Sequence, residues 1–338
     1  MAKIKILSTL VGAVAGLALQ AGAQIVTPAP QEVSAQSSGF TDPLARAAAV
    51  YATFHGDVTD VKSKGFGSAK DIDHSLTSLG GHNPDKLTQG WMAYSALVAS
   101  QNPEFRAAVL DIEGYYGRDV LITGLKNDVR YARTLNGGNS AVNSSISAVN
   151  ADSKRLIGAA AFVKEQAYSL QGAGWAKGKV GNSGAKANGL LASSRNGIPA
   201  RGTMVQAMSS PTINSVLTQA GQAGSPSVWE SVSSVASSIR VPSAVSRLGS
   251  TGRIARGKEP IADRITTLAA YRIIGAEEGP NTHMHVAMQE RETAGCLNMA
   301  NLNLQQCVAA AHKHYEVPFC IGEHALADVG KCIGKVSQ

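Results

Sequence analysis

The sequence has few large aromatic side chains, since phenylalanine, tryptophan and tyrosine together make up only 5% of its 338 residues. Alanine, glycine and serine are abundant instead. Rings are the side chains that fill deep cores with the largest contact areas. We therefore expect a fold in which small side chains allow the elements to pack closely together.

The chain also lacks the motifs that announce common catalytic sites. It contains no Gly-x-Ser-x-Gly nucleophile motif and no complete phosphate-binding Gly-x-x-x-x-Gly-Lys-Ser/Thr motif. Residues Ser183 to Lys186 match Ser-x-x-Lys, but neither Ser-Asp-Asn nor Lys-Thr-Gly follows. We therefore predict a protein that is not an enzyme and uses no cofactor.

Long apolar runs are absent after the first 23 residues. Lys3 and Lys5 precede an apolar stretch, and Ala21-Gly22-Ala23 supplies the small residues that a signal peptidase requires. The stretch stops at Gln20 and is shorter than the roughly 20 residues of a spanning helix. Residues 1–23 therefore predict a signal peptide, followed by a disordered leader at 24–40. The mature protein is expected in the periplasm or cell envelope.

Acidic residues are scarce in the middle of the chain. Between residues 172 and 260, ten basic residues face only Glu230 and Glu259, so this segment carries +8 while the whole chain carries +7. The basic residues are Lys177, Lys179, Lys186, Arg195, Arg201, Arg240, Arg247, Arg253, Arg256 and Lys258. In an exported protein this charge predicts contact with an anionic wall polymer or a lipid surface, and not with nucleic acid.

The spacing of apolar residues is helical, and no segment of strand length alternates with period two. Five pairs of a capping residue and a proline predict helix starts: Asp42-Pro43, Asn83-Pro84, Asn102-Pro103, Ser210-Pro211 and Ser225-Pro226. No period of 20–50 residues indicates a repeat protein. The predicted class is all-α.

The expected order begins with an N-terminal helical bundle at 41–171. A Gly-rich linker at 172–202 follows, because glycines are dense there and the periodicity is lost. Short basic helices at 203–275 complete a Gly/Ser-rich basic middle region. The last segment, 276–338, holds all four cysteines.

An even number of cysteines in an exported chain predicts disulfides. The absence of Cys-x-x-Cys disfavours a catalytic dithiol and a thiolate zinc site. The step from Cys296 to Cys307 is about three helical turns and places both residues on one face. A turn at Pro318 would fold two arms antiparallel, pairing Cys307 with Cys320 and Cys296 with Cys332.

This layout resembles the coiled-coil-helix hairpins with twin Cys-x9-Cys motifs, although both intervals are longer in this chain. The resemblance implies a disulfide-stapled helical hairpin and no function. The step from Cys320 to Cys332 rotates the second cysteine by about 120° on an ideal helix. The outer bridge therefore requires a departure from ideal geometry, which we expect at Gly330.

Histidines collect in the last quarter of the chain, at His283, His285, His312, His314 and His324. Together with nearby methionines they could bind copper or zinc in an oxidising compartment. Their spacings are not diagnostic of a metal site, and solvated or helix-terminal histidines explain them equally. We predict no metal site and keep metal binding as an alternative.

Paired carboxylates give the other alternative. Glu104, Asp111 and Glu113 lie near one another in sequence, and a glycosidase needs two carboxyl groups that flank the scissile bond. Glu104 also sits in a predicted first helical turn, where an acidic residue favours the helix dipole.

The leading hypothesis is a non-enzymatic structural or scaffolding protein of the bacterial cell envelope. It would assemble with envelope proteins or with itself, and its basic segment would contact an anionic polymer or membrane surface. A cell-wall glycan hydrolase and a periplasmic copper- or zinc-binding protein are the alternatives.

Overall fold

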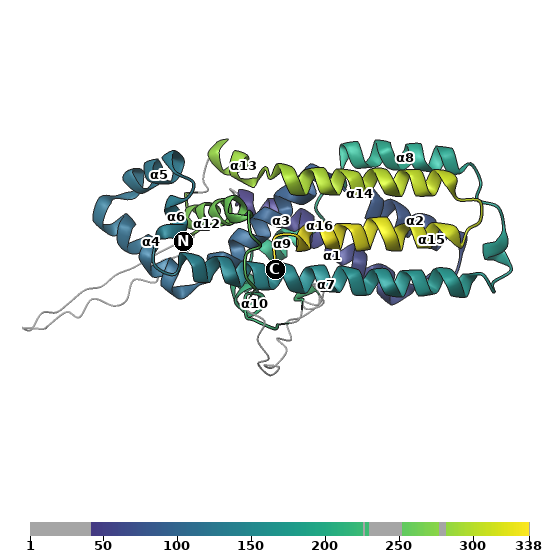
Figure 1. Cartoon of the computed structure of the whole chain (residues 1–338), viewed down its shortest axis with the longest axis horizontal. Coiled ribbons are helices and arrows are strands. Elements are labelled where there is room, and N and C mark those ends of the chain that lie inside the picture. The colour runs from purple at the N-terminus through teal and green to yellow at the C-terminus, as the bar shows by residue number, and fades with distance from the viewer. Residues whose placement is uncertain (1–41, 226, 230–251, 277–281, 338) are drawn as a thin grey trace, which may run out of the picture. The chain divides into compact units, whose positions relative to one another are not determined.

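A computed structural model describes residues 42–225, 227–229, 252–276 and 282–337 (Figure 1). The predicted signal peptide and leader lie outside these residues. Among the described residues there are helices and turns and no strand, so the all-α prediction is confirmed. No helix among them is both long enough and apolar enough to cross a bilayer.

The elements follow one another along the chain as labelled in Figure 1. They are α1 (Pro43–Lys64), α2 (Ala69–Gly80), α3 (Pro84–Ala99), α4 (Pro103–Tyr116), α5 (Arg118–Asn127), α6 (Tyr131–Thr134), α7 (Gly138–Leu170), the 3-10 turn η1 (Trp175–Lys177), α8 (Ser183–Asn196), α9 (Gly202–Ser209), α10 (Ile213–Ala220), α12 (Glu259–Ile273), α13 (Thr282–Met288), α14 (Arg291–Ala310), α15 (Glu316–Cys320), the π-helix η2 (Ile321–Asp328) and α16 (Val329–Gly334).

Side-chain caps begin three of the helices at the predicted Pro positions. The side chains of Asp42, Asn83 and Asn102 accept hydrogen bonds from first-turn amides of α1, α3 and α4, at 2.8 to 3.0 Å. Each cap satisfies one of the amides that a helix start leaves without an intrahelical partner. At Ser210-Pro211 the helix begins later, at Ile213. Pro226 lies outside the described residues.

The centre of the core lies where α1, α3, α7 and α12 pack together. The approach of α1 to α3 depends on Gly90, because a Cβ atom there would lie 2.7 Å from the carbonyl oxygen of Ala47. Trp91 and Tyr94 beside it are buried against the same helices. Small residues thus provide the close contact that the composition predicts, and Trp91 and Tyr94 supply large rings at this centre.

The Gly-rich segment at 172–202 is not a linker in the structure. Its residues 183–196 form α8, which packs on α14. Asn182 caps this helix by accepting from the amide of Ala185 at 3.0 Å, and Leu190 is buried. Cap and packing together offset the low helix propensity of its glycines. Consequently Phe40–Gln338 forms one compact unit, and the expected boundary at 172–202 does not divide it.

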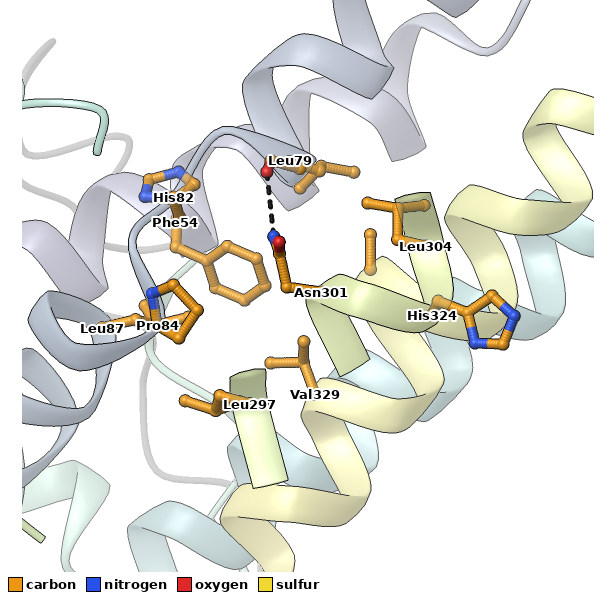
Figure 2. Close-up of a pocket in the computed structure, with 12 residues that line it drawn as sticks. Phe54, Leu79, His82, Pro84, Leu87, Leu297, Asn301, Leu304, His324 and Val329 are labelled. Atoms are coloured by element: carbon orange, nitrogen blue, oxygen red, sulfur yellow. Dashed lines mark hydrogen bonds between the residues drawn. The ribbon is translucent and has the colours of Figure 1, made fainter. Parts of the chain in front are cut away.

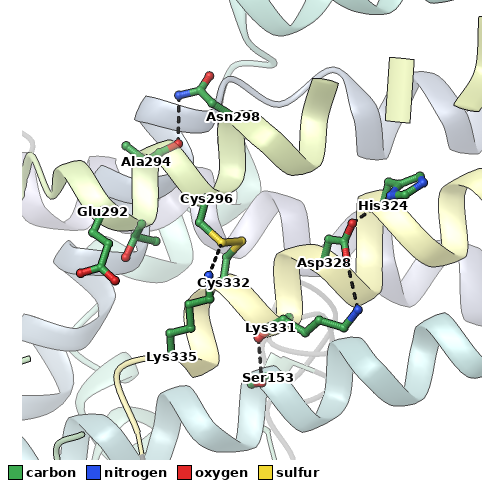
Figure 3. Close-up of a disulfide and its surroundings, with 12 residues drawn as sticks. Ser153, Glu292, Ala294, Cys296, Asn298, His324, Asp328, Lys331, Cys332 and Lys335 are labelled. Carbon is green, nitrogen blue, oxygen red and sulfur yellow. Dashed lines mark hydrogen bonds and ion pairs between the residues drawn. A yellow bond between two sulfur atoms is a disulfide. The ribbon is translucent and has the colours of Figure 1, made fainter. Parts of the chain in front are cut away.

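The C-terminal hairpin carries both predicted disulfides. Cys307 joins α14 to Cys320 of α15, and Cys296 joins α14 to Cys332 of α16. Figure 3 shows the outer bridge between the two arms, with Lys335 beside Cys296. The pairing and the antiparallel arms are as predicted.

The expected departure from ideal helix geometry occurs in η2 and not at Gly330. A π-helix closes i→i+5 bonds and so advances each residue by less than the roughly 100° of an α-helix. The π-helical residues therefore remove most of the rotation that would misplace Cys332. Gly330 serves a different purpose: its backbone touches α7, where Ser153 Oγ donates to the Gly330 carbonyl at 2.8 Å (Figure 3).

Candidate functional site

The three predicted carboxylates lie on α4 but are not brought into a pocket that the structure describes. Glu104 and Asp111 are exposed and Glu113 is half-buried. Glu104 lies in the first turn of the helix, and its Cβ is 2.7 Å from where a Cβ on Gly137 would stand. Glu104 therefore packs closely against Gly137, in the turn that precedes α7. The glycan-hydrolase alternative gains no support from this geometry.

The corner between α4 and α5 exposes large apolar side chains. We call Leu110, Tyr115, Tyr116 and Val120 the α4–α5 surface. Tyr115 is 81% exposed, Tyr116 and Val120 are each 58% exposed, and the tyrosine rings are 4.6 Å apart between centroids. An apolar surface of this kind is a common mark of a binding site for another macromolecule.

The ten predicted basic residues are spread over several parts of the molecule. Acidic partners within the protein hold three of them: Lys186 pairs with Asp73, Arg201 with Asp57 and Asp60, and Lys258 with Glu292. Five are exposed: Lys177, Lys179, Arg195, Arg253 and Arg256. Arg240 and Arg247 lie outside the described residues. Part of the basic charge of residues 172–260 is therefore neutralised by acidic side chains within the protein.

The C-terminal histidines do not gather around one point. Within the described residues, no group of three or more His, Cys, Asp or Glu side chains could hold a metal ion. His324 Nδ1 lies 2.8 Å from Asp328 Oδ2, and His285 Nε2 lies 3.1 Å from Gln289. The ring of His314 faces Trp175 at 6.5 Å. His312 is exposed, and His283 lies on a different helix, α13.

Sequence reasoning missed a buried polar cluster around Asp152 of α7, whose side chain is fully buried. Its Oδ1 accepts from Ser227 Oγ at 2.8 Å and from Trp229 Nε1 at 2.6 Å. Its Oδ2 accepts from Tyr51 Oη at 3.1 Å. The three donors satisfy a carboxylate that burial would otherwise make very costly.

Aromatic rings enclose this carboxylate. The indole of Trp229 stacks on His55, with centroids 4.6 Å apart and planes 12° from parallel. Tyr51 and Tyr94 contact the same indole at 5.4 and 4.8 Å. All of these rings are almost fully buried. The cluster therefore offers no reacting atom to a substrate, and its geometry fixes Trp229 in a slot between α1, α3 and α7.

The protonation of His55 follows from its neighbours. Arg155 can only donate, so its contact with His55 Nδ1 at 3.1 Å makes Nδ1 the acceptor and places the ring proton on Nε2. Nε2 lies 3.9 Å from Asp152 Oδ2. Burial and the positive charge of Arg155 hold the pKa of His55 well below its usual value, so the ring is neutral.

The pKa of Asp152 is raised to about 7, since burial disfavours its charged form. The hydrogen bonds from Ser227, Trp229 and Tyr51 and the charge of Arg155 oppose this effect only in part. Burial, followed by the nearby Asp152, also raises the pKa of Tyr51 well above its usual value, so Tyr51 stays a donor. Asp152 is therefore the group of the cluster that titrates near neutral pH.

A second buried acid, Asp57, ties α1 to two other parts of the bundle. Its Oδ2 lies 2.8 Å from His82 Nε2, and its Oδ1 accepts from Arg201, the residue before α9. Figure 2 shows His82 and Phe54 beside a small hollow under α14. The hollow measures about 20 Å³, room for about one water molecule, so it holds no substrate.

One sequence signal pointed to Asp152. It follows Val149 by three residues and precedes Leu156 by four, a spacing that puts all three on one helical face, where a charged residue among apolar ones is out of place. Its partners Tyr51 and Trp229 lie 101 and 77 residues away, and no spacing rule connects them.

Comparison of the chain with protein-family models, with curated proteins and with solved structures finds no match.

Proposed function

We propose that this protein is a non-enzymatic assembly protein of the bacterial cell envelope, which presents binding surfaces on a rigid helical frame. The observation that carries the proposal is the α4–α5 surface. Tyrosine is enriched in protein–protein interfaces, because its ring offers a large contact area at a low cost in conformational entropy. The paired rings of Tyr115 and Tyr116, with exposed aliphatic side chains on α4 and α5, have the composition of such an interface.

Export is part of the same proposal. The signal-peptide pattern of residues 1–23 supports it, and both disulfides fit an oxidising compartment. The disulfides also support a frame function, since two cross-links in one hairpin limit the motion of the arms. On this proposal the basic residues of the middle segment contact an anionic polymer or lipid surface.

In-cell photo-cross-linking tests the assembly proposal. A benzoylphenylalanine replacing Tyr115 is expected to cross-link to a protein partner, either another envelope protein or a second copy of the chain. The same probe in place of Lys154, an exposed residue of α7, is the matched control. Tyr115→Ser combined with Tyr116→Ser should remove the complex without changing the thermal midpoint of unfolding. If only the monomer appears with the probe at Tyr115, the assembly proposal fails.

A further inference from the structure

The far end of the C-terminal hairpin carries a second apolar surface, where α7 ends and α15 begins (Figure 1). A groove of about 380 Å³ lies there, beside the inner disulfide Cys307–Cys320. Tyr168, Tyr315 and Phe319 line it, and Gln171 and Glu316 are the polar side chains at its walls. Its interior is therefore mainly apolar.

Three aromatic side chains are exposed around this groove. Tyr168 is 61% exposed, and Trp175 and Phe319 are each 38% exposed. The rings of Tyr168 and Phe319 are 6.4 Å apart. Trp175 faces His314, one residue before the groove residue Tyr315. The other two tryptophans, Trp91 and Trp229, are buried, so Trp175 alone exposes an indole.

Three lysines lie on a short ribbon next to these rings. Residues 176–180 run antiparallel to 312–315 and form backbone hydrogen bonds of 3.0 to 3.3 Å. Lys179 stands opposite Lys313 in this bridge, with Lys177 two residues earlier in the chain. Directly opposed residues project their side chains to the same side, so the two ammonium groups repel each other.

No acidic side chain in the described part of the protein neutralises these lysines. Lys164, Lys186 and Lys258 each have a carboxylate partner, but no ion pair involves Lys177, Lys179 or Lys313. The acid closest in sequence, Glu316, accepts from the backbone amides of His312 and Lys313 at 2.6 and 3.1 Å. An external anion would therefore relieve the repulsion that the fold leaves in place.

We infer that this end of the hairpin docks on a bilayer surface rich in anionic lipid. Exposed tryptophan and tyrosine favour the interface between headgroups and acyl chains, and lysines beside them attract anionic headgroups. The apolar groove can receive part of an acyl chain. A wall polymer would engage the lysines and stack its sugars on the rings, but it would leave the apolar groove unfilled, so the lipid surface fits more of the observations. The inference rests on the envelope location in the proposed function, and it is independent of the α4–α5 surface.

Vesicle binding by the purified full-length mature chain tests the inference. We expect sedimentation with vesicles that mix one part of phosphatidylglycerol with two parts of phosphatidylcholine, little sedimentation with phosphatidylcholine alone, and weaker binding at high salt. Trp175 should shift its fluorescence to the blue on binding. A Trp175→Phe variant should lose that shift, because the two remaining indoles are buried.

Two variants and one control identify the surface. Replacing Lys177, Lys179 and Lys313 by Gln should weaken partitioning roughly 100-fold, from about a factor of five per lysine. The double variant Tyr168→Ser, Phe319→Ser should weaken partitioning onto the vesicles but leave the salt dependence of binding unchanged. The control replaces the exposed Lys70, Lys126 and Lys154 by Gln, which changes the net charge equally. Circular dichroism checks that each variant is folded.

Three results would overturn the inference. Equal binding to neutral vesicles would exclude a charge-selective surface, and equal loss in the control would exclude this location. Binding to a soluble polyanion without binding to anionic vesicles would assign the lysines to a polymer. None of these outcomes depends on a protein partner. The vesicle experiments therefore test the hairpin surface independently of the cross-linking experiment at Tyr115.

Discussion

At the scale of single residues, Asp152 places a carboxyl group at the centre of the bundle with three hydrogen-bond donors around it. Its pKa of about 7 in the folded protein compares with roughly 3.9 for an unfolded chain. The folded state therefore binds this proton more tightly than the unfolded state does. It follows that Asp152 stabilises the fold most at low pH, and that this contribution is lost as the pH rises from about 4 to about 7.

We expect Asp152→Asn to remove that dependence. The amide oxygen can still accept from Ser227 and Trp229, and no charge has to be buried. The difference in unfolding free energy between the variant and the wild type should change by on the order of 4 kcal/mol between pH 4 and pH 8, in favour of the variant at high pH. Urea unfolding at four pH values measures this difference. A difference that stays constant with pH would show that Asp152 does not titrate in this range.

At the scale of helices, the contact between α1 and α3 tolerates no side chain at Gly90. Alanine favours a helix over glycine by about 1 kcal/mol, but a Cβ 2.7 Å from a backbone oxygen forces the helices apart. Gly158 of α7 has nothing within 4 Å of the same position. Alanine at Gly158 therefore tests helix propensity alone, whereas alanine at Gly90 tests propensity together with the packing of α1 against α3.

We predict opposite effects for the two alanine substitutions. Gly90→Ala should lower the unfolding free energy by about 1–3 kcal/mol, as overpacked cores do. Gly158→Ala should raise it by about 0.5–1 kcal/mol, because it gains propensity without a clash. Denaturant titration of both variants measures the effects. Equal changes of the same sign would contradict the packing argument.

The π-helix η2 accommodates an extra residue in the second arm of the hairpin. The step from Cys320 to Cys332 is one residue longer than the step from Cys296 to Cys307. Deleting the partly exposed His324 from η2 should convert it to α-helix and make the two steps equal. We expect both disulfides to form in this variant, as peptide mapping without reductant would report. A free Cys332 would show that η2 does more than absorb one extra residue.

At the scale of the whole molecule, Phe40–Gln338 is one compact unit with a continuous core. Calorimetry of the oxidised protein should therefore give a single transition whose van't Hoff and calorimetric enthalpies agree. Two resolved transitions, one of them removed by cleavage within 172–202, would contradict the single unit. They would support the Gly-rich linker that the sequence predicts at 172–202.

The part of this architecture that could be predicted is the part set by local chemistry. The caps at Asp42, Asn83 and Asn102 and the disulfide pairs follow from residue types and helical spacing. Helix α8 could not be predicted, because its stability comes from burying Leu190 against elements distant in sequence. Glycine content reports propensity and says nothing of such packing.

The same limit applies to the candidate surfaces. Lys177 and Lys179 belong to the basic segment, but Lys313 joins them only through the ribbon between 176–180 and 312–315. Phe105, Val109, Ile112 and Tyr116 have the spacing of one apolar helical stripe, but Tyr116 is exposed in the fold. Periodicity identifies an apolar face and does not tell whether another element covers it.

Trp229 and Gly252, on either side of residues 230–251, are both held by α7. Trp229 is bound to Asp152, and the amide of Gly252 donates to Ser147 Oγ at 3.2 Å. The step from Ser147 to Asp152 along one helix spans only about 7.5 Å. Helix α7 therefore acts as a spacer between the two positions: one residue inserted between Ser147 and Asp152 would rotate one attachment point by about 100° relative to the other.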